Sequence, residues 1–176
     1  MLDFPRSTAL DLDDDAIRDR MARSLACSPA DGKWLGLRTP SGGWLINPRH
    51  IGDTLPLPPL RSVPRARNWL RGVTQIGGRL WSVVDLSALL GFRPLPIEDG
   101  ARLVLMPHEK SGNVALICAE VSGLTEIFHL RPMPLPHAPN WIIESFTDDS
   151  NYYWHCLDVE RLAESPMLAN GLEIYA

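Results

Sequence analysis

Apolar residues in this chain occur in short runs separated by turn residues, a pattern typical of β-strands. In the stretch 68–91, a strand-like run is followed by two glycines and then by a returning run. Gly77 and Gly78 can both take the positive φ that a two-residue hairpin turn requires. Asp85 then stands where it can cap a helical turn, and Gly91 where it can end that turn in the left-handed region. This stretch therefore predicts a β-hairpin followed by a capped turn of helix.

The other apolar runs predict further short strands and two helices. An acidic residue caps a predicted helix over 16–26, in which Ile17, Met21 and Leu25 share one face. That face packs on its own domain, which is the commoner case, or meets a partner helix. Asp158 is placed to cap a second short helix. The predicted strands are 34–37, 44–46, 51–55, 71–76, 79–84, 102–106, 113–118 and 121–130.

A sequence pattern near the hairpin occurs twice in the chain. The letters PRARNW at 64–69 are echoed by PHAPNW at 136–141, a spacing of about 72 residues. Each copy leads into an apolar run, a turn, a returning run and an aspartate cap, which is Asp85 or Asp158. Proline-rich entries to strands can look alike by chance, but chance does not explain the same order of cap, hairpin and Asn-Trp entry. We therefore interpret the pattern as an internal duplication.

These elements together indicate a mostly β fold. The 16 prolines argue against long uninterrupted helices and favour many short elements. Many short strands, hairpin turns and few helices are typical of closed or nearly closed antiparallel barrels. Because the pattern is duplicated, we expect two such barrels in one chain.

Composition narrows the class of protein further. The chain has 176 residues and 45% apolar content, which is enough for a core and argues against global disorder. A net charge of −4 gives no general reason to expect nucleic acid or an acidic membrane as partner. No apolar run is long enough to span a membrane, and the acidic N-terminus lacks the hydrophobic stretch of a secretion signal. We expect a cytoplasmic protein whose three cysteines, Cys27, Cys118 and Cys156, are reduced.

The sequence contains no recognisable catalytic or metal-binding motif. Its five histidines share no metal-ligand spacing, and the motifs of phosphate-binding loops, dinucleotide-binding loops and nucleophile elbows are absent. Asp148 and Asp149 are adjacent in a predicted turn, without an apparent acid–base partner. We therefore expect no catalysis, no metal and no cofactor.

One charge pattern distinguishes the first copy of the duplication. Between Thr54 and Val84 there is no acidic residue, whereas two tryptophans and five arginines lie there. Arginine and tryptophan are enriched at protein–protein hot spots, which favours a docking surface. In the alternative interpretation the arginines form an exposed strand face and the tryptophans belong to the core. An interpretation as a nucleic-acid-binding surface has less support, because the patch is short and the chain is acidic. The residues are Arg61, Arg65, Arg67, Arg71, Arg79, Trp69 and Trp81.

The stretch WLRGVTQIGGRLWSVVDLSALLG at 69–91 resembles the central motif of the CheW family of chemotaxis coupling proteins. The segment RLVLMPHEKSGNVALICAEVSGLTEI at 102–127 is similar to the segment that follows this motif in the family. The resemblance extends over 34–163, and the sequence at 63–72 is most similar to the branch that serves twitching motility through type IV pili.

The resemblance implies a fold, partners and a division of the chain. It implies a mostly β protein of two SH3-like antiparallel β-barrel subdomains with a few short helices and no catalysis. It also implies docking to the regulatory domain of a CheA-type histidine kinase and to the tips of methyl-accepting chemoreceptors, with the receptor tip near the groove between the barrels. We expect an acidic tail and helix over 1–32, subdomains over 33–91 and 92–165 with strand exchange between them left open, and a tail over 166–176.

The sequence departs from the family motif at the hairpin. Where the family commonly has Asn-Leu-Arg-Gly, this chain has Gln-Ile-Gly-Gly at 75–78, so the family arginine is replaced by Gly77. The acidic residue that lies earlier in the family corresponds to Asp53, for which Arg79 is a candidate partner. A second hypothesis is therefore an effector on the same fold, which binds a nucleotide second messenger between tryptophan and arginine or binds another signalling protein. The residues predicted to contact partners are Asp53, Trp69, Arg71, Gln75, Gly77, Arg79 and Trp81.

Overall fold

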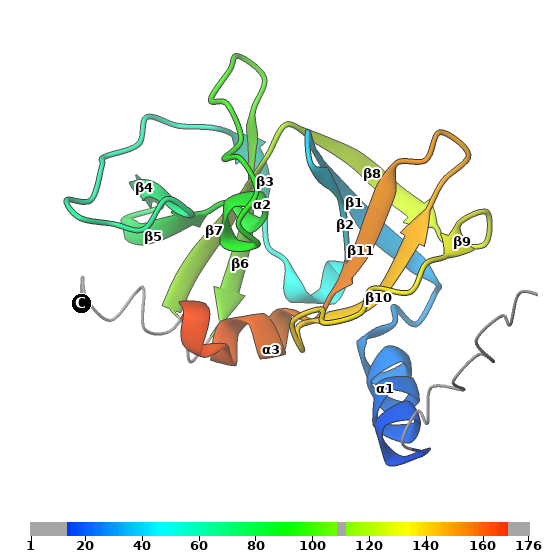
Figure 1. Cartoon of the computed structure of the whole chain (residues 1–176). Coiled ribbons are helices and arrows are strands. Elements are labelled where there is room, and N and C mark those ends of the chain that lie inside the picture. Colours follow the sequence, from blue (N-terminus) through cyan, green and yellow to red (C-terminus); the bar gives the residue numbers. More distant parts are fainter. Residues whose placement is uncertain (1–13, 109–111, 169–176) are drawn as a thin grey trace, which may run out of the picture.

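The computed structural model describes residues 14–108 and 112–168, which form two β-sheets accompanied by short helices (Figure 1). The six-stranded sheet has the order β8-β1-β2-β11-β10-β9, and the five-stranded sheet has the order β3-β6-β7-β5-β4. The strands of the first are β1 (Lys33–Thr39), β2 (Gly42–Ile46), β8 (Glu120–Glu126), β9 (Arg131–Pro132), β10 (Ile142–Thr147) and β11 (Tyr153–Leu157). Those of the second are β3 (Thr54–Pro56), β4 (Leu70–Ile76), β5 (Arg79–Val84), β6 (Arg102–His108) and β7 (Gly112–Cys118).

Most of the helices are short and lie between or beside the sheets, and α1 extends away from them (Figure 1). They are α1 (Asp14–Cys27), α2 (Leu86–Leu89), α3 (Val159–Glu164) and the 3-10 helix η1 (Pro48–His50). The mostly β fold class expected from the sequence is confirmed, and the two sheets correspond to two SH3-like subdomains. The strands are not all antiparallel, however, because β5 pairs with β7 and β11 pairs with β2 in parallel. Both parallel pairs join strands separated by a long connection, as such pairing requires.

The two sheets exchange strands. The five-stranded sheet is built from residues 54–118, and the six-stranded sheet from 33–46 together with 120–157. The chain therefore leaves the six-stranded sheet after β2 and returns to it at β8. The boundary expected between 91 and 92 falls inside the segment that forms the five-stranded sheet. The two sequential halves of the chain therefore do not correspond to the two sheets.

The hairpin and the helix caps predicted at Asp85 and Asp158 are confirmed. Gly77 and Gly78 have φ of 58° and 77° at the turn between β4 and β5. The Asp85 carboxylate accepts hydrogen bonds from the N–H groups of Ser87 and Ala88 at the start of α2. Gly91, with φ 86°, ends that turn in the left-handed region. These features follow from local φ requirements, which is why the sequence alone reveals them.

The duplicated sequence pattern corresponds to a duplicated structure. In the turns before β4 and β10, Arg65 and His137 occupy equivalent places with φ of 59° and 64°. The two aspartate caps are tied in the same way, because the N–H groups of Asp85 and Asp158 donate to the carbonyl oxygens of Trp69 and Trp141, each at 2.8 Å. In both copies, the tryptophan that precedes the strand is therefore joined to the aspartate that caps the following helix.

One hydrophobic core spans both sheets. It contains Leu37 and Ile46 from the six-stranded sheet, Val84 and Leu116 from the five-stranded sheet, and Trp141 at the start of β10. Two smaller clusters lie on the far sides of the sheets. Because the largest core is shared, we expect the two subdomains to fold together.

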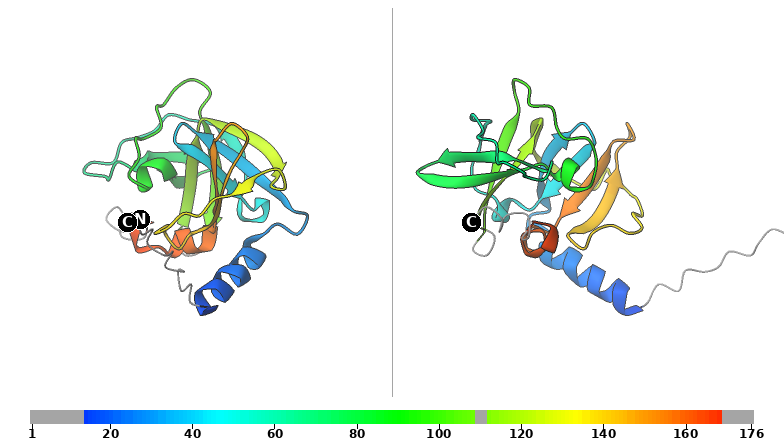
Figure 2. Two further views of the ribbon diagram at one scale, coloured as in Figure 1. Left: turned by 45° about the vertical axis from the view of Figure 1, so that its right-hand side comes forward. Right: turned by 60° about the vertical axis from the view of Figure 1, so that its left-hand side comes forward.

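Helix α1 contacts β10, but Met21 and Leu25 of its apolar stripe are not buried by the rest of the molecule. Met21 is 62% exposed and Leu25 is 79% exposed, whereas the side chain of Ile17 lies outside the described residues. Both views of Figure 2 show α1 directed away from the sheets. The commoner expectation, packing on the helix's own domain, is therefore wrong for Met21 and Leu25.

Candidate functional site

The hairpin formed by β4 and β5 projects from the edge of the five-stranded sheet (green, at the left of the right-hand view in Figure 2). At its end, Gln75 pairs with Leu80 and Ile76 pairs with Arg79 across the two strands. Gln75, Arg79 and the two turn glycines are exposed, and Leu80 is 63% exposed. The hairpin thus presents a large apolar side chain among polar groups, as docking surfaces do.

The pairing register divides these side chains between two faces. Residues paired directly across antiparallel strands point to the same face, and so do residues two apart in one strand. Arg61 forms a bridge with Val73, which lies two residues before Gln75. Arg61, Val73, Gln75 and Leu80 therefore share one face, and Arg79 lies on the opposite face.

Arg71 is engaged inside the protein. Its guanidinium donates to the Asp85 carboxylate at 3.0 Å and to the carbonyl oxygen of Leu95 at 2.6 Å. The same Asp85 oxygen accepts the N–H of Leu95 at 2.6 Å, so the three groups tie β4, the α2 cap and the following loop together. With 17% of its side chain exposed, Arg71 positions the hairpin rather than offering its charge to a partner.

Trp69 and Trp81 are core residues. Each is 5% exposed; Trp69 lies in the shared core, and Trp81 lies in a cluster with Leu103 and Ile117. Their burial agrees with the alternative interpretation of the sequence, in which the tryptophans belong to the core. A base-stacking site needs an accessible ring, so these two tryptophans offer no support for nucleotide binding. Their burial instead fixes both ends of the β4–β5 hairpin to the body of the protein.

Asp53 lies in the connection between η1 and β3. Its side chain is exposed, and its carbonyl oxygen accepts the N–H of Leu105 at 2.9 Å. Within the described residues, Asp53 and Arg79 form no ion pair. Both charges are therefore available to other groups.

Four arginines of the first copy are exposed, and within the described part of the chain none makes a hydrogen bond or ion pair through its side chain. Three of them lie in the segment 61–67, which we call the arginine loop, and the fourth lies at the hairpin end. They are Arg61, Arg65, Arg67 and Arg79. The sequence signal for this set was the absence of acidic residues from Thr54 to Val84. Leu80 was missed, because an apolar residue in a strand is assigned to the core by default.

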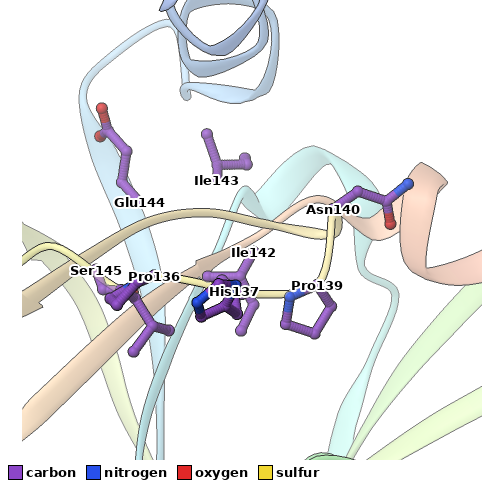
Figure 3. A pocket seen from close by; sticks show the side chains of 10 residues that line it. Pro136, His137, Pro139, Asn140, Ile142, Ile143, Glu144 and Ser145 are labelled. Atoms are coloured by element: carbon purple, nitrogen blue, oxygen red, sulfur yellow. The ribbon is translucent and has the colours of Figure 1, made fainter. Parts of the chain in front are cut away.

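The second copy carries a groove but no catalytic arrangement. It has a volume of about 390 Å³ and lies between the loop 135–140 and β10. Figure 3 shows the Glu144 side chain directed away from His137, so the groove presents no paired acid and base. In the described residues, no group of three or more His, Cys, Asp or Glu is arranged to hold a metal.

A serine–histidine pair is present but buried. The Ser145 hydroxyl lies 2.8 Å from Nδ1 of His155, and the two residues are 3% and 8% exposed. The Trp44 ring packs on the imidazole with ring centres 5.3 Å apart, and burial lowers the pKa of His155. A substrate cannot reach a pair enclosed in this way, so the pair contributes to the core.

No helix of the described segments is long and apolar enough to cross a membrane.

The chain is similar to proteins of one family. The sequence model of the CheW-like domain matches residues 34–167. Protein PilI of Pseudomonas aeruginosa (strain PAO1) is 29% identical over 113 residues, which cover 60% of this chain and 63% of PilI, less than two thirds of that relative. The solved structure of scaffolding protein TtCheW from Thermoanaerobacter tengcongensis superimposes with a TM-score of 0.60 and 12% identity, covering 77% of this chain and 94% of that chain. At this identity the similarity to TtCheW concerns the fold.

Proposed function

Because this chain belongs to the CheW-like domain family, we propose that it is a non-enzymatic adaptor of the cytoplasm that couples methyl-accepting chemoreceptors to a CheA-type histidine kinase. The observation that carries the proposal is the family match, which spans 34–167 and includes both sheets. The similarity to PilI supports a place in the pilus-based, twitching-motility branch. The buried Ser145–His155 pair supports a role without catalysis.

Coupling requires that the adaptor bind one state of the kinase better than another. A ligand shifts an equilibrium only by its difference in affinity for the two states. The shared core holds the two sheets in a fixed relation, so partners docked on the two subdomains are held at a fixed distance and angle. A rigid bridge of this kind transmits a change in one partner as a change in contacts with the other.

The docking surface for the kinase is the end of the β4–β5 hairpin. Gln75, Gly77, Arg79 and Leu80 are its exposed residues, and Asp53 is a further exposed charge of the same subdomain. Trp69, Trp81 and Arg71 act through the hairpin by holding it to the body of the protein. The replacement of the family arginine by Gly77 leaves Arg79 as the charged residue nearest the turn.

The proposal is tested by reconstituting the protein with the CheA-type kinase and the receptor of its own organism. The measurements are binding to the kinase by calorimetry and kinase autophosphorylation with and without receptor. We expect Leu80→Asp to weaken kinase binding by about tenfold or more, because one charged residue at a docking centre costs on the order of 1–2 kcal/mol. Ile97→Asp is the matched control, since Ile97 is also exposed, at 52%, on a loop of the same sheet. A folded wild-type protein that binds neither kinase nor receptor would refute the adaptor assignment.

A further inference from the structure

The arginine loop is a positively charged surface that the protein itself does not neutralise. Arg61, Arg65 and Arg67 are exposed, and their guanidinium groups have no hydrogen-bond or ion-pair partner within the described residues. Arg65 has φ 59°, and the turn that contains it is closed by the hydrogen bond from the N–H of Ala66 to the carbonyl of Val63, at 3.2 Å. The backbone thus holds this loop in a defined shape, with its charges in solvent.

The chemistry of the loop favours carboxylates as its ligands. Of the 17 basic residues in the chain only Lys33 and Lys110 are lysines, and the patch is made of arginine alone. The planar guanidinium presents two parallel N–H donors that match the two oxygens of a carboxylate.

The same chain carries a complementary acidic segment. Residues 11–15 read Asp-Leu-Asp-Asp-Asp, and Asp19 follows one turn of helix later. Asp15 and Asp19 are exposed on α1. Met21 and Leu25, also exposed on α1, add apolar surface next to these carboxylates. Helix α1 lies outside the segment 34–167 that matches the CheW-like domain, so it is an addition to that domain.

Within the residues that the structure describes, no hydrogen bond or ion pair joins α1 to the side chains of the arginine loop. In Figure 1 and in the right-hand view of Figure 2, the β4–β5 hairpin lies at the left of the body and α1 at its lower right. Asp15 forms an ion pair with Arg18 of the same helix, at 4.0 Å. Asp15 and Asp19, carried on a helix that lies far from the hairpin, can reach the arginine loop of another copy.

We propose that the acidic segment 11–19 of one molecule docks on the arginine loop of a second molecule. Exposed Leu80, which shares a face with Arg61, meets the apolar side chains of α1 in this contact. The contact joins two different surfaces, so it repeats head to tail and forms rings or open chains rather than a symmetric dimer. It does not depend on the adaptor proposal, because it involves this chain alone.

The test is the association state of the full chain, measured by sedimentation velocity from low to high protein concentration. In about 50 mM salt we expect association that grows with concentration, and we expect it to weaken about tenfold or more in about 500 mM salt, where exposed charges are screened over a few ångströms. The double variants Arg65→Glu with Arg67→Glu, and Asp13→Arg with Asp15→Arg, should each be monomeric. Circular dichroism establishes that each variant is folded.

Mixing these two variants separates a specific contact from general charge effects. In the first variant both the loop and the segment are acidic. In the second the loop stays basic, and segment 11–19 has no net charge because three aspartates oppose three arginines. Only the mixture therefore contains an acidic segment together with a basic loop. We expect the mixture to form a complex that neither variant forms by itself. The matched controls carry equal changes in net charge on other exposed residues: Arg93→Glu with Arg102→Glu, and Glu98→Arg with Asp99→Arg. These controls should associate like the wild type.

Three results would overturn the proposal. The first is a wild type that stays monomeric in low salt at every concentration. The second is equal loss of association in the control variants, which would assign the effect to net charge. The third is a mixture of the two docking variants that does not associate. Kinase and receptor are absent from all of these measurements, so failure here leaves the adaptor proposal intact.

Discussion

At the scale of single residues, the structure shows polar side chains that are used internally. Arg71 is the clearest case, since the Asp85 carboxylate and the Leu95 carbonyl take up its donors. The Asp148 carboxylate similarly accepts from the Ser150 hydroxyl and from the N–H groups of Ser150 and Tyr152. These hydrogen bonds, the Ser150 hydroxyl first, lower the pKa of Asp148 to about 2. The Asp148 carboxylate, which accepts the hydrogen bonds of the β10–β11 turn, therefore stays ionised down to strongly acidic pH.

His155 gives a prediction for the pH dependence of stability. Burial lowers its pKa in the folded protein below the ordinary value of 6.5, whereas the unfolded chain keeps that value. Below about pH 6.5 the unfolded chain therefore binds more protons than the folded protein, and the free energy of unfolding falls as the pH falls. We expect urea unfolding to show this loss between pH 7 and pH 5.5, and His155→Gln to reduce the slope. His129→Gln, which changes an exposed histidine, is the control and should leave the slope unchanged.

At the scale of elements, the duplicated caps differ in what they hold. Asp85 binds two backbone N–H groups of α2, the Leu95 N–H and the Arg71 guanidinium. Asp158 binds one backbone N–H, that of Arg161, and pairs with the same arginine's side chain at 3.5 Å. The first cap thus connects three segments of the chain, whereas the second is local to α3.

The caps give a paired prediction for stability. Asp85→Ala leaves the buried donors of Leu95 and Arg71 without their acceptor, so we expect a loss of about 3–5 kcal/mol in the free energy of unfolding. Asp158→Ala removes one helix cap, for which the expected loss is about 1 kcal/mol. Denaturant unfolding of both variants measures the difference. Equal losses would show that the contacts of Asp85 with Arg71 and Leu95 add nothing to the cap.

At the scale of the whole molecule, the shared core and the strand exchange make the two sheets one structural unit. The chain crosses from one sheet to the other twice, and the largest core cluster draws on both sheets. Neither sheet can therefore lose its packing without exposing apolar surface of the other. Helix α1 stands outside this unit, which leaves its exposed side chains available for contacts between molecules.

A substitution in the shared core should therefore destabilise both sheets together. Trp141 is 1% exposed and lies in that core, so we expect Trp141→Ala to cost about 3–5 kcal/mol. Unfolding should remain a single transition, coincident by circular dichroism and by tryptophan fluorescence. Two separate transitions, one for each sheet, would contradict the shared-core description.

The sequence by itself determined the local features and the family of this protein. The Gly77–Gly78 turn, the caps at Asp85 and Asp158 and the duplicated tryptophan entry depend on φ requirements and on spacing along the chain, which a sequence displays directly. The mostly β class and the CheW resemblance follow from the same local patterns. The sequence also shows that these arginines cluster in a stretch without acidic residues. It does not show which of the arginines remain without an ion-pair partner in the folded protein.

Only the tertiary structure decided which side chains are exposed and which strands are neighbours. Trp69 and Trp81 turned inward, and Met21 and Leu25 turned outward, because burial depends on packing between segments far apart in the chain. The exchange of strands between the sheets likewise depends on pairing across long connections, for which adjacent residues carry no signal. The docking surfaces proposed for this protein consist of what that packing left exposed.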